Sequence, residues 1–116
     1  MAIDTSSILF CYENGIDIFD TLKFMGYKSI VSRGVIRELE KKAIGNSGKK
    51  SYAKLALEAI KTKHIYVEKS DEYVDNWIKE KAAIMPVCTN DIELKRELKK
   101  RGVKVFTASR GGKIRQ

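Results

Sequence analysis

Short apolar runs alternate along the chain with longer amphipathic segments, and this alternation limits the folds open to it. The apolar runs fall at residues 2–3, 29–31, 64–67, 86–88 and 103–106. The segments between them carry apolar residues at helical spacing. Strands that alternate with helices predict β-α units around a parallel sheet. We therefore expect an α/β fold with a central, mostly parallel sheet of five strands.

The amphipathic segments predict the helices and the limits of the domain. Helices are expected at residues 6–12, 17–25, 33–44, 52–61, 71–83 and 92–101, and a loop at residues 45–51. Asn90, with Glu93 three residues later, predicts a capping box at the start of the last helix. A chain of 116 residues is the size of one domain. We place this domain at residues 1–107 and expect residues 108–116 to form a basic, flexible tail.

The charge of the chain points to a polyanionic partner. Lysine and arginine total 23 against 15 acidic residues, which gives a formal net charge of +8. Such a surplus favours nucleic acid as a partner. A soluble basic protein without such a partner is equally compatible with the charge alone.

Cysteine and histidine usage argues against a zinc site and for a reducing compartment. Cys11 and Cys88 lack metal-type spacing, and His64 is the single histidine. The chain opens without a signal-peptide pattern and has no apolar run of membrane-spanning length. We expect a cytoplasmic protein that does not enter a membrane.

Four acids follow predicted strands or lie in the first half of predicted helices. They are Asp4, Glu38, Asp75 and Asp91. In a parallel sheet, active groups gather beyond the carboxyl ends of the strands, so all four are expected to approach one edge. Clustered carboxylates repel one another, and a hard cation with oxygen ligands, Mg²⁺ or Mn²⁺, would relieve this repulsion. Each acid alone also has a structural explanation.

These structural explanations are local. Asp4 and Asp91 could each help to cap the helix that follows. Glu38 could pair with Lys41 or Lys42, and Asp75 could be a solvated helix acid.

Four motifs occur in order along the chain. They are IDTSSIL at residues 3–9, VSRGVIRELE at 31–40, VDNWIKEKA at 74–82 and CTNDIELKRELKKRGVKVF at 88–106. In this order they resemble the PIN domain, a family of metal-dependent ribonucleases. The run TND-x-x-L-K and the segment SGKKSYAKLALEAI, residues 47–60, are most similar to small archaeal proteins related to ribosomal-RNA-processing PIN endonucleases. VapC-type toxins share the same acids.

This resemblance implies a three-layer α/β/α fold and a catalytic site. Asp4, Glu38, Asp75 and Asp91 would be the catalytic ligands of Mg²⁺ or Mn²⁺. Ser6, Thr89 and Asn90 would orient the carboxylates, although Ser6 is shorter than the asparagine more usual at its position.

The implied activity is hydrolysis of RNA phosphodiester bonds by metal-activated water, in ribosomal RNA processing or ribosome maturation. A VapC-type toxin and a non-catalytic RNA-binding or ribosome-assembly module are the alternatives. The RNA would be single-stranded or ribosomal. A homodimer, and an antitoxin or assembly factor as partner, are left open.

Six basic residues are candidates for contacts with RNA phosphates: Lys49, Lys50, Lys95, Lys99, Arg110 and Lys113. Solvated helix faces and loops explain the same residues equally well.

Overall fold

The computed structural model describes residues 1–46 and 48–116, so Ser47 of the expected loop lies outside the described residues. Its sheet has the order β3-β2-β1-β4-β5-β6. The strands are β1 (Ala2–Ile3), β2 (Ile30–Ser32), β3 (Tyr66–Glu68), β4 (Val87–Cys88), β5 (Val105–Ala108) and β6 (Ile114–Arg115). The first five pair in parallel, which confirms the predicted α/β class with a mostly parallel sheet.

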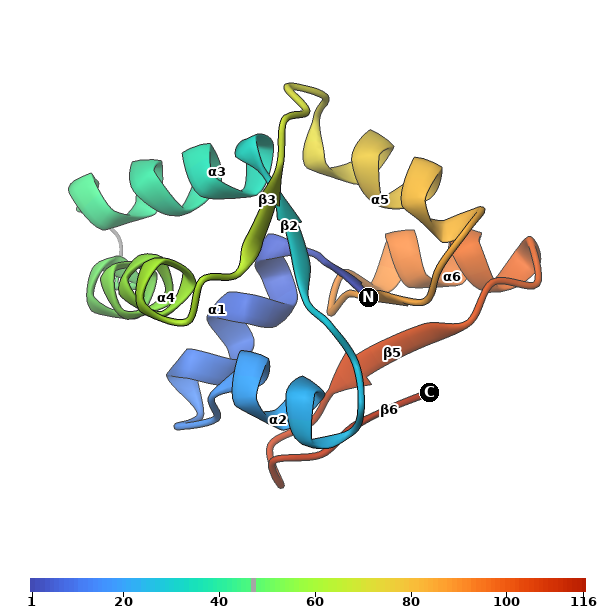
Figure 1. Cartoon of the computed structure of the whole chain (residues 1–116), viewed down its shortest axis with the longest axis horizontal. Coiled ribbons are helices and arrows are strands. Elements are labelled where there is room, and N and C mark those ends of the chain that lie inside the picture. Colours follow the sequence, from blue (N-terminus) through green and yellow to red (C-terminus); the bar gives the residue numbers. More distant parts are fainter. Residues whose placement is uncertain (47) are drawn as a thin grey trace.

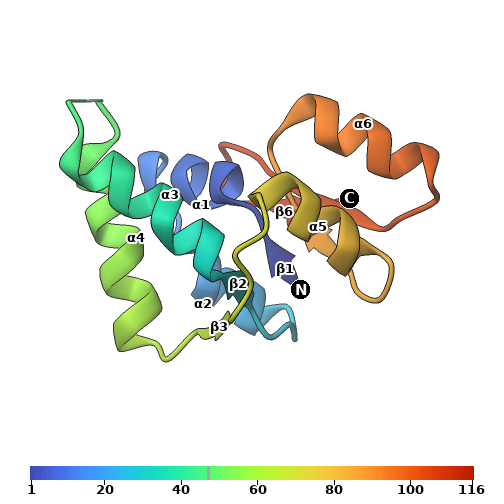
Figure 2. The same cartoon turned by 90° about the horizontal axis from the view of Figure 1, so that it is seen from above.

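Helices flank the sheet on both faces. They are α1 (Thr5–Glu13), α2 (Ile18–Phe24), α3 (Arg33–Ile44), α4 (Lys50–Thr62), α5 (Val74–Ala82) and α6 (Ile92–Lys100). Figures 1 and 2 show α1, α3 and α4 on one side of the strands and α5 and α6 on the other. The expected three layers are therefore present.

The end of the chain differs from the expectation. Residues 108–116 contain a sixth strand, which pairs antiparallel with β5 through Thr107–Arg115 and Ala108–Ile114. A tight turn makes this pairing feasible, because Gly112 adopts a φ of 77°, which glycine tolerates without strain. Ile114 is only 4% exposed, so the tail supplies one side chain to the core. The expected five-stranded count and the expected flexible tail are both wrong in this respect.

The fifth helix begins three residues later than predicted. It starts at Val74 because the residues before it form a loop that is fixed to α3. In that loop, Asp71 lies 3.1 Å from Arg33 and 2.8 Å from Arg37 in two ion pairs. Within residues 1–46 and 48–116, no helix is long and apolar enough to cross a membrane.

Candidate active site

The pairing of β1 with β4 brings the first and last acidic motifs together. Ile3 pairs with Cys88, and the backbone N–H of Asp4 donates to the carbonyl of Cys88 at 2.9 Å. Asp4 and Thr89 therefore leave adjacent strands at the same edge of the sheet. Eighty-five positions along the chain separate them.

Asp4 is a buried carboxylate held by two hydroxyls. Its side chain is 4% exposed, and its Oδ2 accepts from Thr89 Oγ1 at 2.6 Å and from Ser6 Oγ at 2.8 Å. Burial raises the pKa of Asp4 above the usual 3.8, and the two hydrogen bonds oppose this rise. The negative charges of Asp75 and Glu38 raise the pKa further. Both helix acids therefore lie within electrostatic range of Asp4.

A close contact between α3 and the loop before α5 positions these two helix acids. Figure 2 shows that both helices begin beside the carboxyl ends of the central strands. A Cβ on Gly34, in the first turn of α3, would lie 2.9 Å from the backbone carbonyl oxygen of Glu72. Only glycine permits this approach without a shift, because real Cβ atoms do not come so close to backbone oxygen. The two Asp71 ion pairs join the same segments.

Asp91 belongs to the same edge and also caps a helix. Its Oδ1 accepts from the backbone N–H of Leu94 at 3.1 Å at the start of α6. Its own N–H donates to Thr89 Oγ1 at 3.1 Å. Thr89 thus links Asp91 to Asp4 through one hydroxyl. The capping interpretation of Asp91 is confirmed, and a second carboxylate oxygen remains for another role.

Asn90 does not cap α6, so the capping-box prediction is wrong for this residue. Its side-chain oxygen instead accepts from Ser7 Oγ at 2.7 Å and from the Ala108 N–H at 3.1 Å. Its side-chain amide donates to the Ala108 carbonyl at 3.0 Å. Its backbone N–H donates to Ser6 Oγ at 3.0 Å. Asn90 therefore ties α1 and β5 to the loop that carries Thr89 and Asp91.

The donor chemistry of the edge suits a hard divalent cation. Asp4 is buried, Asp91 is half-buried, and Glu38 and Asp75 are exposed. A cation at this edge would stabilise the Asp4 carboxylate, which burial and the charges of Asp75 and Glu38 now destabilise. In the described chain, no three His, Cys, Asp or Glu side chains are grouped closely enough to hold a metal ion together. The carboxylate oxygens are the type of ligand that such an ion prefers. In this structure, however, they lie farther apart than the ligands of a single ion.

Ion pairs with neighbouring lysines do not explain Glu38. Among the described residues, neither Lys41 nor Lys42 forms an ion pair with it. The alternative explanation of Glu38 as one half of an (i, i+3) or (i, i+4) pair therefore has no support in the structure.

The six basic candidates do not share one surface. Lys49 and Arg110 line one pocket of about 560 Å³ with Tyr52, and Lys49 forms an ion pair with Glu13 there. Lys50 begins α4, Lys95 and Lys99 lie on α6, and Lys113 precedes β6. Their role in RNA binding stays a prediction.

Sequence reasoning missed residues that hold the loops of the site in position. Ser7 is fully buried and fixes Asn90, and Gly34 sets the approach of the loop to α3. The hydroxyl of Thr5 is buried without a hydrogen-bond partner among the described residues. A glycine inside a helical pattern is the one available signal in the sequence, because it often marks close packing.

Comparison with known proteins gives the same assignment as the motifs. The family described as "PIN like domain" matches residues 1–110. Ribonuclease VapC9 of Archaeoglobus fulgidus is 33% identical over 107 residues, which cover 89% of this chain and 78% of that protein.

Solved structures agree. The PIN domain endonuclease Utp24 superposes with a TM-score of 0.77 at 28% identity, covering 98% of this chain and 87% of that one. A domain of a functionally unknown protein from Methanocaldococcus jannaschii shares the fold, with a TM-score of 0.63 at 17% identity over 93% of this chain and 89% of that one. With the match to its family model extending over residues 1–110, this chain belongs to the PIN-like domain family.

Proposed function

We propose that this protein is a divalent-metal-dependent endoribonuclease. The observation that carries the proposal is the environment of Asp4. This carboxylate is buried, hydrogen-bonded by Thr89 and Ser6, and placed within the electrostatic reach of Asp75 and Glu38. The similarity to Ribonuclease VapC9 and to the endonuclease Utp24 supports a nuclease as the function of this edge.

The four acids share one task in this proposal. Asp4, Glu38, Asp75 and Asp91 would draw together to hold Mg²⁺ or Mn²⁺, which would supply an activated water and stabilise charge on the phosphate. Thr89 and Ser6 fix the orientation of the Asp4 carboxylate by donating to Oδ2. Asn90 fixes the loop that carries Asp91 by its four hydrogen bonds.

The proposed substrate is single-stranded or ribosomal RNA, and the proposed role is ribosomal RNA processing in the cytoplasm. The net charge of +8 suits a polyanionic substrate. A second candidate role is that of a toxin ribonuclease with an antitoxin partner, which the 33% identity to Ribonuclease VapC9 favours. A strong arrest of growth on expression, relieved by Asp4→Asn, would favour the toxin role.

The test of the activity is cleavage of a labelled single-stranded RNA with and without Mn²⁺. We expect cleavage that requires the ion and is lost in Asp4→Asn and in Asp91→Asn. The Asp91→Asn variant keeps an oxygen that can cap α6, so its loss of activity would not reflect loss of the helix. Binding of the RNA without cleavage by the wild-type protein would favour the non-catalytic module. Cleavage that survives both substitutions would place the activity elsewhere.

A further inference from the structure

A second pocket lies at the edge of the sheet opposite the carboxylates. It has a volume of about 510 Å³ and is lined by residues of α2 and of the segments that enter β2 and β3. Because β2 and β3 run parallel to β1, their amino ends lie away from the edge that carries Asp4. In Figure 1, α2 lies near the ends at which the chain enters β2 and β3. Its volume falls in the range of small-molecule sites.

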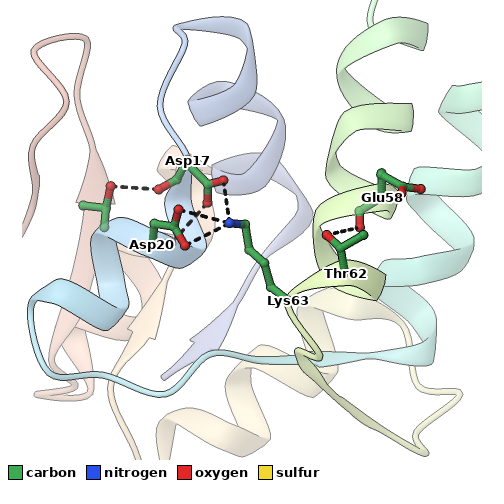
Figure 3. Close-up of polar contacts among 6 residues, drawn as sticks. Asp17, Asp20, Glu58, Thr62 and Lys63 are labelled. Carbon is green, nitrogen blue, oxygen red and sulfur yellow. Dashed lines mark hydrogen bonds and ion pairs between the residues drawn. The ribbon is translucent and has the colours of Figure 1, made fainter.

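The lining of this pocket carries excess positive charge. Three lysines, Lys23, Lys28 and Lys63, face one aspartate, Asp20. Figure 3 shows Lys63 reaching from the end of α4 to the start of α2, where its Nζ lies 3.0 Å from each carboxylate oxygen of Asp20 and 3.4 Å from Asp17 Oδ2. Lys63 therefore offsets the negative charges of Asp17 and Asp20. Across residues 1–46 and 48–116, neither Lys23 nor Lys28 has an ion-pair partner.

Two tyrosines add flat surfaces beside these lysines. Tyr66 lies on β3, the edge strand, and is 61% exposed. Tyr27 is half-buried, and its ring packs edge-to-face on Phe106 with centroids 5.5 Å apart and an interplanar angle of 65°. Tyr27 is thus packed against the core through Phe106, whereas most of Tyr66 is exposed to solvent. Aromatic rings beside free cations are the elements of single-stranded nucleic-acid sites.

The backbone of His64 is a further, independent sign of a site. His64 is the residue after the C-cap of α4, and its φ is 53°, the one positive φ of a non-glycine residue in the described chain. The N–H of Ile65 donates to the Ile60 carbonyl at 3.0 Å and that of His64 to Lys61 at 3.3 Å. This is a Schellman motif, in which glycine normally occupies the position of His64. His64 thus adopts a backbone that glycine adopts more readily, and it lines the pocket.

We propose that this pocket binds one nucleotide of a single-stranded RNA. The base stacks on Tyr66, the phosphates contact Lys23 and Lys28, and His64 contributes a hydrogen bond. The proposal rests on the proposed function only for the choice of RNA as the ligand, and the pocket is separate from the carboxylate edge. It gives the protein a second anchoring point, so that a bound strand extends from one edge of the sheet to the other.

The test is fluorescence anisotropy with a labelled oligouridylate in EDTA, where metal-dependent cleavage cannot occur. We expect Tyr66→Ala to weaken binding at least about fivefold, because stacking of one base is lost. Tyr66→Phe keeps the ring and should bind like the wild type. Lys23→Ala with Lys28→Ala should make the slope of log affinity against log salt shallower by about 1.4, the value for two phosphate contacts on a single strand. Lys41→Ala with Lys54→Ala, which removes equal charge from α3 and α4, should change this slope less.

His64→Gly separates binding from stability. Glycine suits the backbone at this position, so we expect a Tm equal to or above that of the wild type together with weaker RNA binding. Wild-type affinity and an unchanged salt slope in the Tyr66, His64 and double-lysine variants would overturn the proposal, as would a wild-type protein that does not bind the oligouridylate.

The two proposals fail separately. Asp4→Asn should not cleave the oligouridylate when Mn²⁺ is added, and adding Tyr66→Ala to it should weaken binding in EDTA by the same factor as in the wild type. Retained cleavage in Asp4→Asn would contradict the nuclease proposal and leave the pocket supported by its own variants.

Discussion

The surroundings of Asp4 act on its pKa in opposite directions. Its carboxylate is buried and lies near two other acids, which raises its pKa, yet two hydroxyls donate to one of its oxygens and favour the charged form. The hydroxyls fix the direction of the carboxylate but do not remove the repulsion. The ionised side chain therefore costs folding stability in the absence of a cation.

At the residue scale we predict that Asp4→Asn stabilises the metal-free protein. Folding raises the pKa of Asp4 above its unfolded value, near 3.8. The protein therefore loses folding stability as the pH rises from the unfolded pKa through the folded pKa of this side chain. Asparagine keeps an oxygen that can accept from Thr89 and Ser6 but carries no charge. We expect a rise in Tm of roughly 2–5 °C at neutral pH, since about 1 kcal/mol has that effect in a domain of this size.

Thermal unfolding with and without Mn²⁺ measures this effect. The wild-type protein should gain stability when the ion is added, and Asp4→Asn should gain much less. A lower Tm for the metal-free variant would contradict the assignment of Asp4 as a strained carboxylate.

At the element scale, the segments before α5 decide how the two helix acids approach Asp4. Gly34 allows the loop to lie against the first turn of α3, and Asp71 pairs with Arg33 and Arg37 of the same helix. At the other side of this loop, Glu68 of β3 accepts hydrogen bonds from the indole of Trp77 and from Lys81. The start of α5 is thus held to α3, and its middle and end are held to the edge strand.

Gly34→Ala tests the close contact. In an open helix, alanine would stabilise the protein by about 0.5–1 kcal/mol. Here the added Cβ would meet the Glu72 carbonyl oxygen at 2.9 Å, so we expect a loss of about 1–3 kcal/mol. The loop should move outward, and RNA cleavage should fall with it. Gly111→Ala, where nothing lies within 4 Å of the added Cβ, is the matched control for chemical denaturation. Equal stability of the two variants would mean that the loop does not press on α3.

Glu68→Gln tests the attachment of α5 to β3. Lys81 and then Trp77, by their hydrogen bonds, lower the pKa of Glu68 below the ordinary value of 4.5. The charged Glu68 therefore stabilises the folded protein above pH 4.5, and this stabilisation is lost as the pH falls through the lower pKa of Glu68 in the folded state. We expect the glutamine variant to lose about 1 kcal/mol at neutral pH, less than the roughly 1.5–3 kcal/mol of a hydrogen bond to a charged group, because solvent screens the partly exposed Glu68. Denaturant unfolding at several pH values should show this difference shrink in acid. A difference that does not depend on pH would assign the effect to packing instead of charge.

Most of the helices and strands could be predicted from the sequence. Alternating apolar runs and helical periodicity predicted the parallel strands and all six helices, because local pattern dominates there. The antiparallel β6 was missed, since a strand of two residues is defined by its partner β5 and has no pattern of its own. Topology predicted that Asp4, Glu38 and Asp75 approach one edge, and the structure brings Glu38 and Asp75 within electrostatic range of Asp4. The hydrogen bonds of Asn90 depend on contacts across 83 and 18 positions that no local motif encodes.

On the scale of the whole molecule, the core encloses both thiols. Cys11 and Cys88 have 0% exposure. Burial raises the pKa of Cys11 to about 12 and that of Cys88 to about 11. Thiolates are the reactive form, so both side chains should be inert in the folded protein.

We therefore predict that Ellman's reagent titrates neither of the 2 cysteines of the native protein and both of them in guanidinium chloride. The rate of the native reaction, if one is seen, should follow the opening of the core as denaturant is added. Rapid labelling of either thiol without denaturant would show that the core opens readily around α1 and β4.

The hydrogen bond from Thr89 to Asp4 joins residues that leave the ribosome far apart in time, with 85 positions between them. Under the proposed function, Asp4 is synthesised 85 residues before its partner hydroxyl on Thr89, and Asp91 follows Thr89, so the site cannot form until the ribosome has passed these residues. Incomplete products would then be harmless to the messenger being read, and synthesis itself would delay the appearance of cutting activity.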